Sequence, residues 1–111
     1  MFQGVAGNLE HYMSLLSARQ KLVASNIANA DTPGYQTQDL DFRAEFENAA
    51  SGTSPMPVQP KDLPAKADGN NVNLDREARL LAENALRFSI ASSFARSDLS
   101  SIRTAMQEGK S

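Results

Sequence analysis

The 111-residue chain contains no cysteine and no tryptophan, and it has a single histidine, His11. Without cysteine there can be no disulfide, no thiolate metal site and no cysteine nucleophile. One histidine cannot complete a tetrahedral zinc site by itself. We therefore interpret His11 as a solvated residue on a helix.

The chain also lacks a large excess of charge of either sign, because 11 basic and 13 acidic side chains leave a net charge of -2. Such a chain offers no positive field to nucleic acid. The acidic residues gather between positions 31 and 68, where Asp39, Asp41, Glu45 and Glu47 form a short polar run. This run indicates a solvated face rather than an acid–base pair, because nothing apolar surrounds it. We expect no catalytic residue, no cofactor, no metal and no nucleic-acid partner.

Long hydrophobic runs are missing as well. No stretch approaches the 18 or so apolar residues that a membrane-spanning helix needs, so no transmembrane span is expected. The N-terminus also lacks the basic start and the apolar centre of a secretory signal peptide. If the protein leaves the cytoplasm, we expect it to be exported without a cleaved signal peptide.

The chain does have two matching apolar repeats, one toward each end, with steps of three and four residues. The first comprises Phe2, Ala6, Leu9, Met13, Leu16, Gln20, Val23, Ile27 and Ala30; the second comprises Leu74, Ala78, Leu81, Ala85, Phe88, Ser92, Ala95, Leu99, Ile102 and Met106. This spacing keeps an apolar seam on one side of a helix, and the seam needs a partner helix. We predict a helix over residues 2–30 and another over 74–107, packed as a coiled-coil-like pair.

The packing residues follow from these seams. We expect one group from the first helix to pack against a second group from the last helix, in the same chain or in a neighbouring one. The first group is Leu9, Met13, Leu16, Val23 and Ile27; the second is Leu81, Phe88, Leu99 and Ile102.

Residues 31–73 follow a different pattern. Pro33 and Gly34 suit the centre of a type II turn, and a short helix capped by Asp39 or Asp41 is expected around Phe42 and Phe46. Four prolines within ten residues, namely Pro55, Pro57, Pro60 and Pro64, predict an extended or mobile segment. Asn71 or Asn73 can cap the last helix. The predicted fold is mainly α, as one elongated rod-type domain over residues 1–111.

The last helix carries a second apolar line, Leu86, Ile90 and Phe94, offset from its main seam. A helix with one partner needs one seam, so a second line suggests a second neighbour. The alternative is that Tyr35, Phe42 and Phe46 of the same chain cover this line. Periodicity alone does not separate the two.

The end of the first helix carries the string SNIANADTPGY, from Ser25 to Tyr35. This string resembles the signature of the bacterial flagellar axial proteins, which comprise rod, hook and hook-associated subunits. The motif residues are Asn26, Asn29, Asp31, Thr32, Pro33, Gly34 and Tyr35. The later string DGNNVNLDREARLLAENALRFSIASS, from Asp68 to Ser93, resembles the corresponding segment of the proximal rod proteins in that family.

This resemblance implies a structural, non-enzymatic subunit of the flagellar basal-body rod. Its terminal helices would pack with those of other copies into a tube that transmits torque and carries export. The implied partners are other rod subunits, the inner-membrane ring and the export-gate proteins, with a periplasmic location reached by type III export. The alternatives are a different rod subunit of the family, or a cytoplasmic coiled-coil adaptor or chaperone.

Two roles remain open for the motif residues. Asn26 and Asn29 either fray the helix end or form hydrogen bonds between subunits that set their register. Likewise, Tyr35 either closes a simple chain reversal or anchors the middle segment on a neighbouring subunit.

Overall fold

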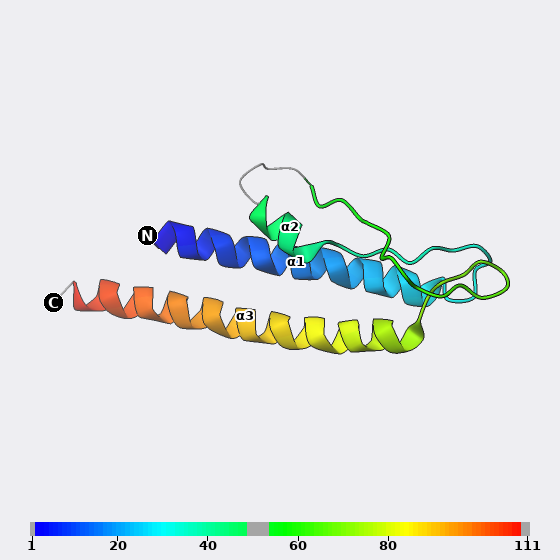
Figure 1. The fold of residues 1–111 in the computed structure, drawn as a ribbon. Coiled ribbons are helices and arrows are strands. Elements are labelled where there is room, and N and C mark those ends of the chain that lie inside the picture. Colours follow the sequence, from blue (N-terminus) through cyan, green and yellow to red (C-terminus); the bar gives the residue numbers. More distant parts are fainter. Residues whose placement is uncertain (1, 49–53, 110–111) are drawn as a thin grey trace.

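A computed structural model describes residues 2–48 and 54–109, with side chains described from Gly7 onward. It contains three helices, α1 (Phe2–Ala28), α2 (Phe42–Glu47) and α3 (Leu74–Glu108). Helices α1 and α3 run antiparallel side by side, and the segments that connect the helices gather at the end where α1 stops and α3 starts (Figure 1). The molecule measures 70 × 27 × 17 Å. This confirms the mainly α fold with paired terminal helices.

The helix ends follow from side-chain capping. Helix α1 ends two residues before the expected Ala30, where the Asn29 side chain donates to the Ser25 carbonyl oxygen at 2.8 Å. Asp41 caps α2 by accepting from Ala44 N–H at 3.2 Å, and Asn73 caps α3 by accepting from Arg76 N–H at 3.1 Å. Asp41 is one of the two residues predicted to cap the short helix, and Asn73 is one of the two predicted to cap the last helix.

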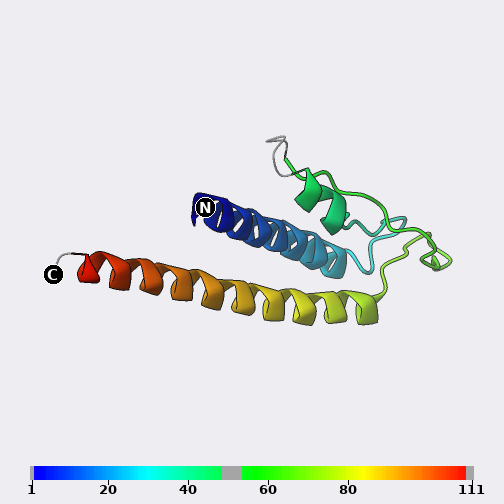
Figure 2. The same cartoon turned by 60° about the vertical axis from the view of Figure 1, so that its left-hand side comes forward.

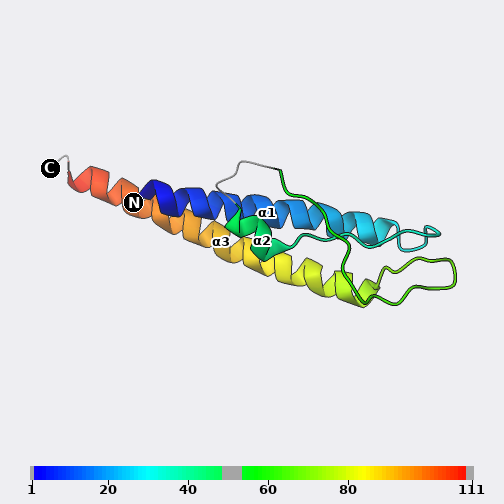
Figure 3. The same ribbon diagram turned by 45° about the horizontal axis from the view of Figure 1, so that its top comes forward.

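The Pro-rich segment is extended and anchored in its described part. A two-residue antiparallel bridge joins Asp39 to Val58 through N–H···O bonds of 2.8 and 2.7 Å. Pro55 and Pro57 line a hollow together with Leu22 of α1. Figure 3 shows this segment passing back over the helices. Among the described residues no regular strand forms. Besides this bridge, Met56 N–H donates to Glu45 Oε1 at 3.1 Å, so both contacts fix the segment to the first half of the chain.

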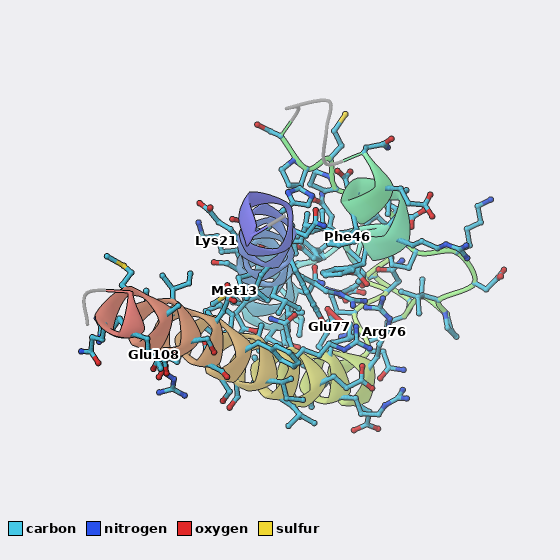
Figure 4. All side chains as sticks on the ribbon, turned by 90° about the vertical axis from the view of Figure 1, so that its left-hand side faces the viewer. Met13, Lys21, Phe46, Arg76, Glu77 and Glu108 are labelled. Carbon is cyan, nitrogen blue, oxygen red and sulfur yellow. The ribbon has the colours of Figure 1, made fainter. Side chains whose placement is uncertain are left out.

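Helix α2 packs on the side of α1 that faces away from α3 (Figure 4). The rings of Phe42 and Phe46 lie 5.4 and 6.2 Å from the ring of Tyr12. His11 is half-buried, 5.9 Å from the Phe46 ring, and its Nε2 hydrogen-bonds the Glu45 carbonyl oxygen at 3.3 Å. The solvated position expected for His11 is therefore wrong, because α2 folds back over it.

The contact between α1 and α3 combines apolar and polar residues. Leu15, Leu16 and Val23 of α1 are buried, whereas the buried residues of α3 are Glu77, Asn84 and Ala91, one in every seven. Asn84 donates to the Leu16 carbonyl oxygen at 2.8 Å and to Gln20 Oε1 at 3.0 Å. The buried residues of α3 thus lie on a face beside the expected seam. The two helices draw apart toward their free ends (Figures 1 and 2).

Candidate functional site

The first half of the candidate site is a polar network at the junction of α1, the connecting segments and α3. Its centre is Asn26, which is fully buried. The Asn26 amide donates to the Gln38 carbonyl oxygen at 2.8 Å and to Glu77 Oε1. Its Oδ1 accepts from Tyr35 Oη at 3.0 Å and from Gln38 N–H at 3.1 Å. Both donors and both acceptor positions are occupied.

In the single chain Asn26 therefore uses its full hydrogen-bonding capacity on its own residues, and a register-setting bond from its amide to a neighbouring subunit stays a prediction. Tyr35 also bonds within its own chain, to Asn26 and, at 3.2 Å, to Ser25 Oγ. Asn29 uses its side chain on Ser25 and on the Thr32 hydroxyl at 3.0 Å. These residues hold the chain's own turn together.

Asp39 links both long helices. Arg19 of α1 donates to its two carboxylate oxygens at 2.9 Å each, and Arg76 of α3 donates to Oδ2 at 2.7 Å. Burial alone would raise the pKa of Asp39, but the bonds from Arg19, Leu40 N–H and Arg76, with the charge of Arg19, hold it below its ordinary value. The solvated face expected for Asp39 is therefore wrong, whereas Asp41 and Glu47 are exposed as expected.

Glu77 completes the network. Its side chain is fully buried, and its Oε2 accepts from Arg76 Nη1 at 2.7 Å. Figure 4 shows Arg76 and Glu77 projecting from α3 into the interior of the molecule. Two arginines and two carboxylates balance in charge, which a buried ionic cluster requires. We call Arg19, Asn26, Tyr35, Asp39, Arg76 and Glu77 the junction network.

A second set of contacts ties the turn of the motif to the residues that precede α3. The buried Asn70 amide donates to the carbonyl oxygens of Asn29 and Thr32, both at 2.8 Å. Asn71 Oδ1 accepts from Thr37 N–H at 2.6 Å. Asn70 and Asn71 thereby fix the turn against the chain before α3.

The glycines of the two loops meet. Gly34 and Gly69 have φ values of +76° and +87°, and a Cβ on Gly69 would lie 3.4 Å from Gly34 Cα. The turn predicted at Gly34 therefore has the required positive φ, which glycine adopts without steric cost. Asp31, Thr32 and Pro33 are exposed, with Asp31 4.0 Å from Lys66 Nζ.

Sequence reasoning missed most of the charged members of the junction network. Arg19, Asp39, Arg76 and Glu77 lie far apart along the chain, and no local pattern pairs them. One signal was available, since polar Glu77 and Asn84 recur at the same interval as the apolar seam.

The second half of the candidate site is an apolar surface along the two long helices. Leu16 and Val23 are buried inside the chain, Leu9 and Met13 are half-buried, and Ile27 is exposed. On α3, Leu81, Phe88 and Leu99 are 37–50% exposed, and Ile102 is half-buried. The side chains of Phe2 and Ala6 lie outside the described part.

Between the free ends of α1 and α3 lies a groove of about 590 Å³. We call it the apolar groove; its apolar lining is Leu9, Met13, Phe88, Ala95, Leu99 and Ile102. The structure thus brings several of the expected packing residues of both helices together. The α3 side of the groove remains largely open.

The second apolar line of α3 is even more exposed. Leu86, Ile90 and Phe94, which we call the apolar ridge, are 52–68% exposed. Phe42 and Phe46 contact Tyr12, and Tyr35 bonds to Asn26, so these three residues do not bury the ridge within the chain.

Two kinds of feature are absent from residues 2–48 and 54–109. No group of three or more histidine, cysteine or acidic side chains is placed to hold a metal ion there. None of the helices in that part is both long enough and apolar enough to cross a bilayer.

Comparison with known proteins agrees with the motif. The model of a family described as "Flagella basal body rod protein" matches residues 13–36, a span that includes Arg19, Asn26 and Tyr35. The chain is 33% identical to the flagellar basal body rod protein FlgB of Proteus mirabilis strain HI4320, over 87% of this chain and 89% of that protein.

Two more FlgB proteins show how widely the similarity extends. The one from Escherichia coli K12 is 30% identical over 87% of this chain and 88% of its own length. The one from Bacillus subtilis strain 168 is 26% identical over 99% of this chain and 98% of its own length. With these relatives, the chain belongs to the flagellar basal body rod proteins of the FlgB family and is a structural subunit of the rod.

Proposed function

We propose that this chain forms the proximal end of the rod, in the periplasm, and that it is exported there by the flagellar type III apparatus without loss of a signal peptide. The segment from Asp68 to Ser93, which resembles that of proximal rod proteins, supports the position. The resemblance of the string from Ser25 to Tyr35 to the flagellar axial proteins, which implies type III export, supports the export route. Its partners are other rod subunits, the inner-membrane ring and the export-gate proteins, and it has no catalytic role.

The structural observation that supports assembly of this chain with partners is the exposed apolar surface of α3. Large apolar side chains that are at least 37% exposed occur along nearly its whole length: Leu74, Leu81, Leu86, Phe88, Ile90, Phe94, Leu99 and Met106. A monomeric soluble protein rarely leaves so much apolar surface in contact with water, and such patches mark interaction sites. Burial of each large side chain on assembly contributes roughly 1.5–3 kcal/mol before ordering costs.

A cytoplasmic coiled-coil adaptor would also carry apolar seams on its helices. It would not account for the match to the rod family over residues 13–36, or for the similarity to FlgB over most of the chain. The seams alone do not decide between the two, whereas the motif favours the rod.

Mass spectrometry of purified hook-basal bodies tests the proposal. We expect a small fixed number of copies per particle, together with a peptide that begins at Met1 or Phe2 in the assembled protein. Absence from the particles, with the chain in the cytoplasmic fraction, would contradict the rod assignment. A mature protein that begins well inside α1 would contradict export without cleavage.

A further inference from the structure

The apolar groove and the apolar ridge lie on opposite flanks of α3. Ala91 is buried against α1 and marks the inner face of the helix. Ile90 and Leu99 are separated by two and a half turns at about 3.6 residues per turn, which places them on opposite sides of α3. Each subunit therefore carries two apolar stripes, one on either flank of α3.

The two stripes also differ in charge. Glu10 and Asp98 line the apolar groove, whereas Arg87 lines the hollow that Ile90 and Phe94 border. None of these three charged residues forms an ion pair within residues 7–48 and 54–109. The groove thus has an acidic rim, and the ridge has a basic neighbour.

We propose that the apolar ridge of one copy packs into the apolar groove of the next copy, with Arg87 facing the acidic rim formed by Glu10 and Asp98. This inference rests on the proposed function and specifies which faces of the subunit meet. The occupant is a second copy of this chain, because the chain carries both halves of a contact that matches in apolar character and is complementary in charge.

The dimensions agree with this arrangement. Leu86 to Phe94 rises about 12 Å along the helix axis, and Phe88 to Ile102, which bound the α3 side of the groove, rise about 21 Å. A contact between two different faces is heterologous, so it continues from copy to copy and generates a ring or a helical array. Side-by-side packing of this kind is what a tube wall needs.

Engineered cysteines test the contact, because the natural chain has none. In cells that build flagella, we expect oxidation of Ile90→Cys/Leu99→Cys to give a ladder of dimers and larger oligomers. Either single variant alone should remain monomeric, because each contact needs one thiol from each face. The two positions are too far apart in one helix to form a disulfide within a chain. The matched control is Ser89→Cys/Ser100→Cys, on the outward side of α3, which should give no ladder.

Dimers from either single variant would show a contact between identical faces and would overturn the proposal. It would also be overturned if the double variant gave no ladder while the chain was present in purified basal bodies, or if it cross-linked only to a chain of different mass. These results would leave rod membership intact. Absence of the unsubstituted chain from basal bodies would instead overturn the proposed function.

Charge reversal provides an independent test if the cysteine variants fail to assemble. We expect Arg87→Glu and Asp98→Arg each to lower the copies per basal body several-fold, and the double reversal to restore them. Arg96→Glu, on the outward side of α3, should leave the copy number unchanged. Lack of restoration in the double variant would overturn the pairing of ridge and groove.

Discussion

The two ends of the α1–α3 pair differ in how far their side chains are paired and buried within the chain. At the junction, buried polar groups from four segments bond to one another, and Asn26 has no unused hydrogen-bonding position. At the free ends, the helices draw apart around the apolar groove, and Phe88 and Leu99 remain 41% and 50% exposed. One end is completed by the chain itself, and the other is left for a partner.

This difference separates specificity from affinity. A buried polar network contributes little net stability, but its bonds can form in only one arrangement, so it fixes how the two helices meet. An apolar groove accepts several arrangements, and its burial provides free energy of association. The substitutions below are directed at one end or the other.

The largest loss of stability is expected from Asp39→Ala at the junction. This change leaves the guanidinium groups of Arg19 and Arg76, whose side chains are only 18% and 20% exposed, without their shared carboxylate. We expect the free energy of unfolding to fall by about 3 kcal/mol, measured by urea denaturation followed by helical circular dichroism.

The matched control is Asp41→Ala, two residues away, which removes only the cap of α2 and should cost about 1 kcal/mol. Equal losses from the two variants would show that the ion pairs of Asp39 do not stabilise the junction.

Acid should remove part of the same contribution. The pKa of Asp39 in the folded protein is lowered from its ordinary value, so its interactions contribute fully above the unfolded-state pKa of about 3.9. The contribution is lost as the pH falls through the lower folded-state pKa. We expect the stability difference between the natural protein and Asp39→Ala to be constant from about pH 5 to 7 and to shrink below about pH 4. A difference that grows with acidity would contradict this sign.

Substitution of glycine by alanine should change the free energy of unfolding less, and in opposite directions in the turn at the junction and within α1. Gly34→Ala places a side chain at φ +76° and should destabilise the protein by about 1–2 kcal/mol, although nothing lies within 4 Å of the new Cβ. Gly7→Ala, within α1 and equally uncrowded, should stabilise it by up to about 1 kcal/mol. Thermal unfolding of both variants measures the contrast. Stabilisation by Gly34→Ala would show that the positive φ is dispensable.

The smallest effect on stability, with a large effect on assembly, is expected from Leu99→Asp in the apolar groove. Because Leu99 is half-exposed in the single chain, the substitution should change the free energy of unfolding of the protein by no more than about 0.5 kcal/mol. Cells that carry this variant should lose swimming, scored on soft agar, whereas Ser100→Asp on the adjacent outward face should swim. Normal swimming with Leu99→Asp would show that the groove is not an assembly surface.

Apolar periodicity was sufficient to predict the two long helices, and the Asx residues before α2 and α3 were sufficient to predict their caps. Apolar periodicity did not identify the face of α3 that packs on α1, because the polar residues Glu77 and Asn84 are buried on that face by partners more than 50 residues away. A local pattern also cannot show whether an apolar stripe is buried within a chain or between chains. The seam expected on α3 includes residues that remain half-exposed, such as Phe88 and Leu99.

The junction network also imposes an order on folding. Asn26 and Asp39 are made early, since a ribosome synthesises the chain from its N-terminus, yet their respective bonding partners Glu77 and Arg76 come much later. Until those residues have emerged, Arg19 can already bond to Asp39, and Asn26 to Tyr35 and Gln38, but the positions that Arg76 and Glu77 occupy in the folded chain are open to water, and burying them unpaired would cost free energy. A partly synthesised chain therefore cannot close the hairpin prematurely. The delay follows from where the bonding partners lie along the chain, so the chain itself sets the time at which it can fold.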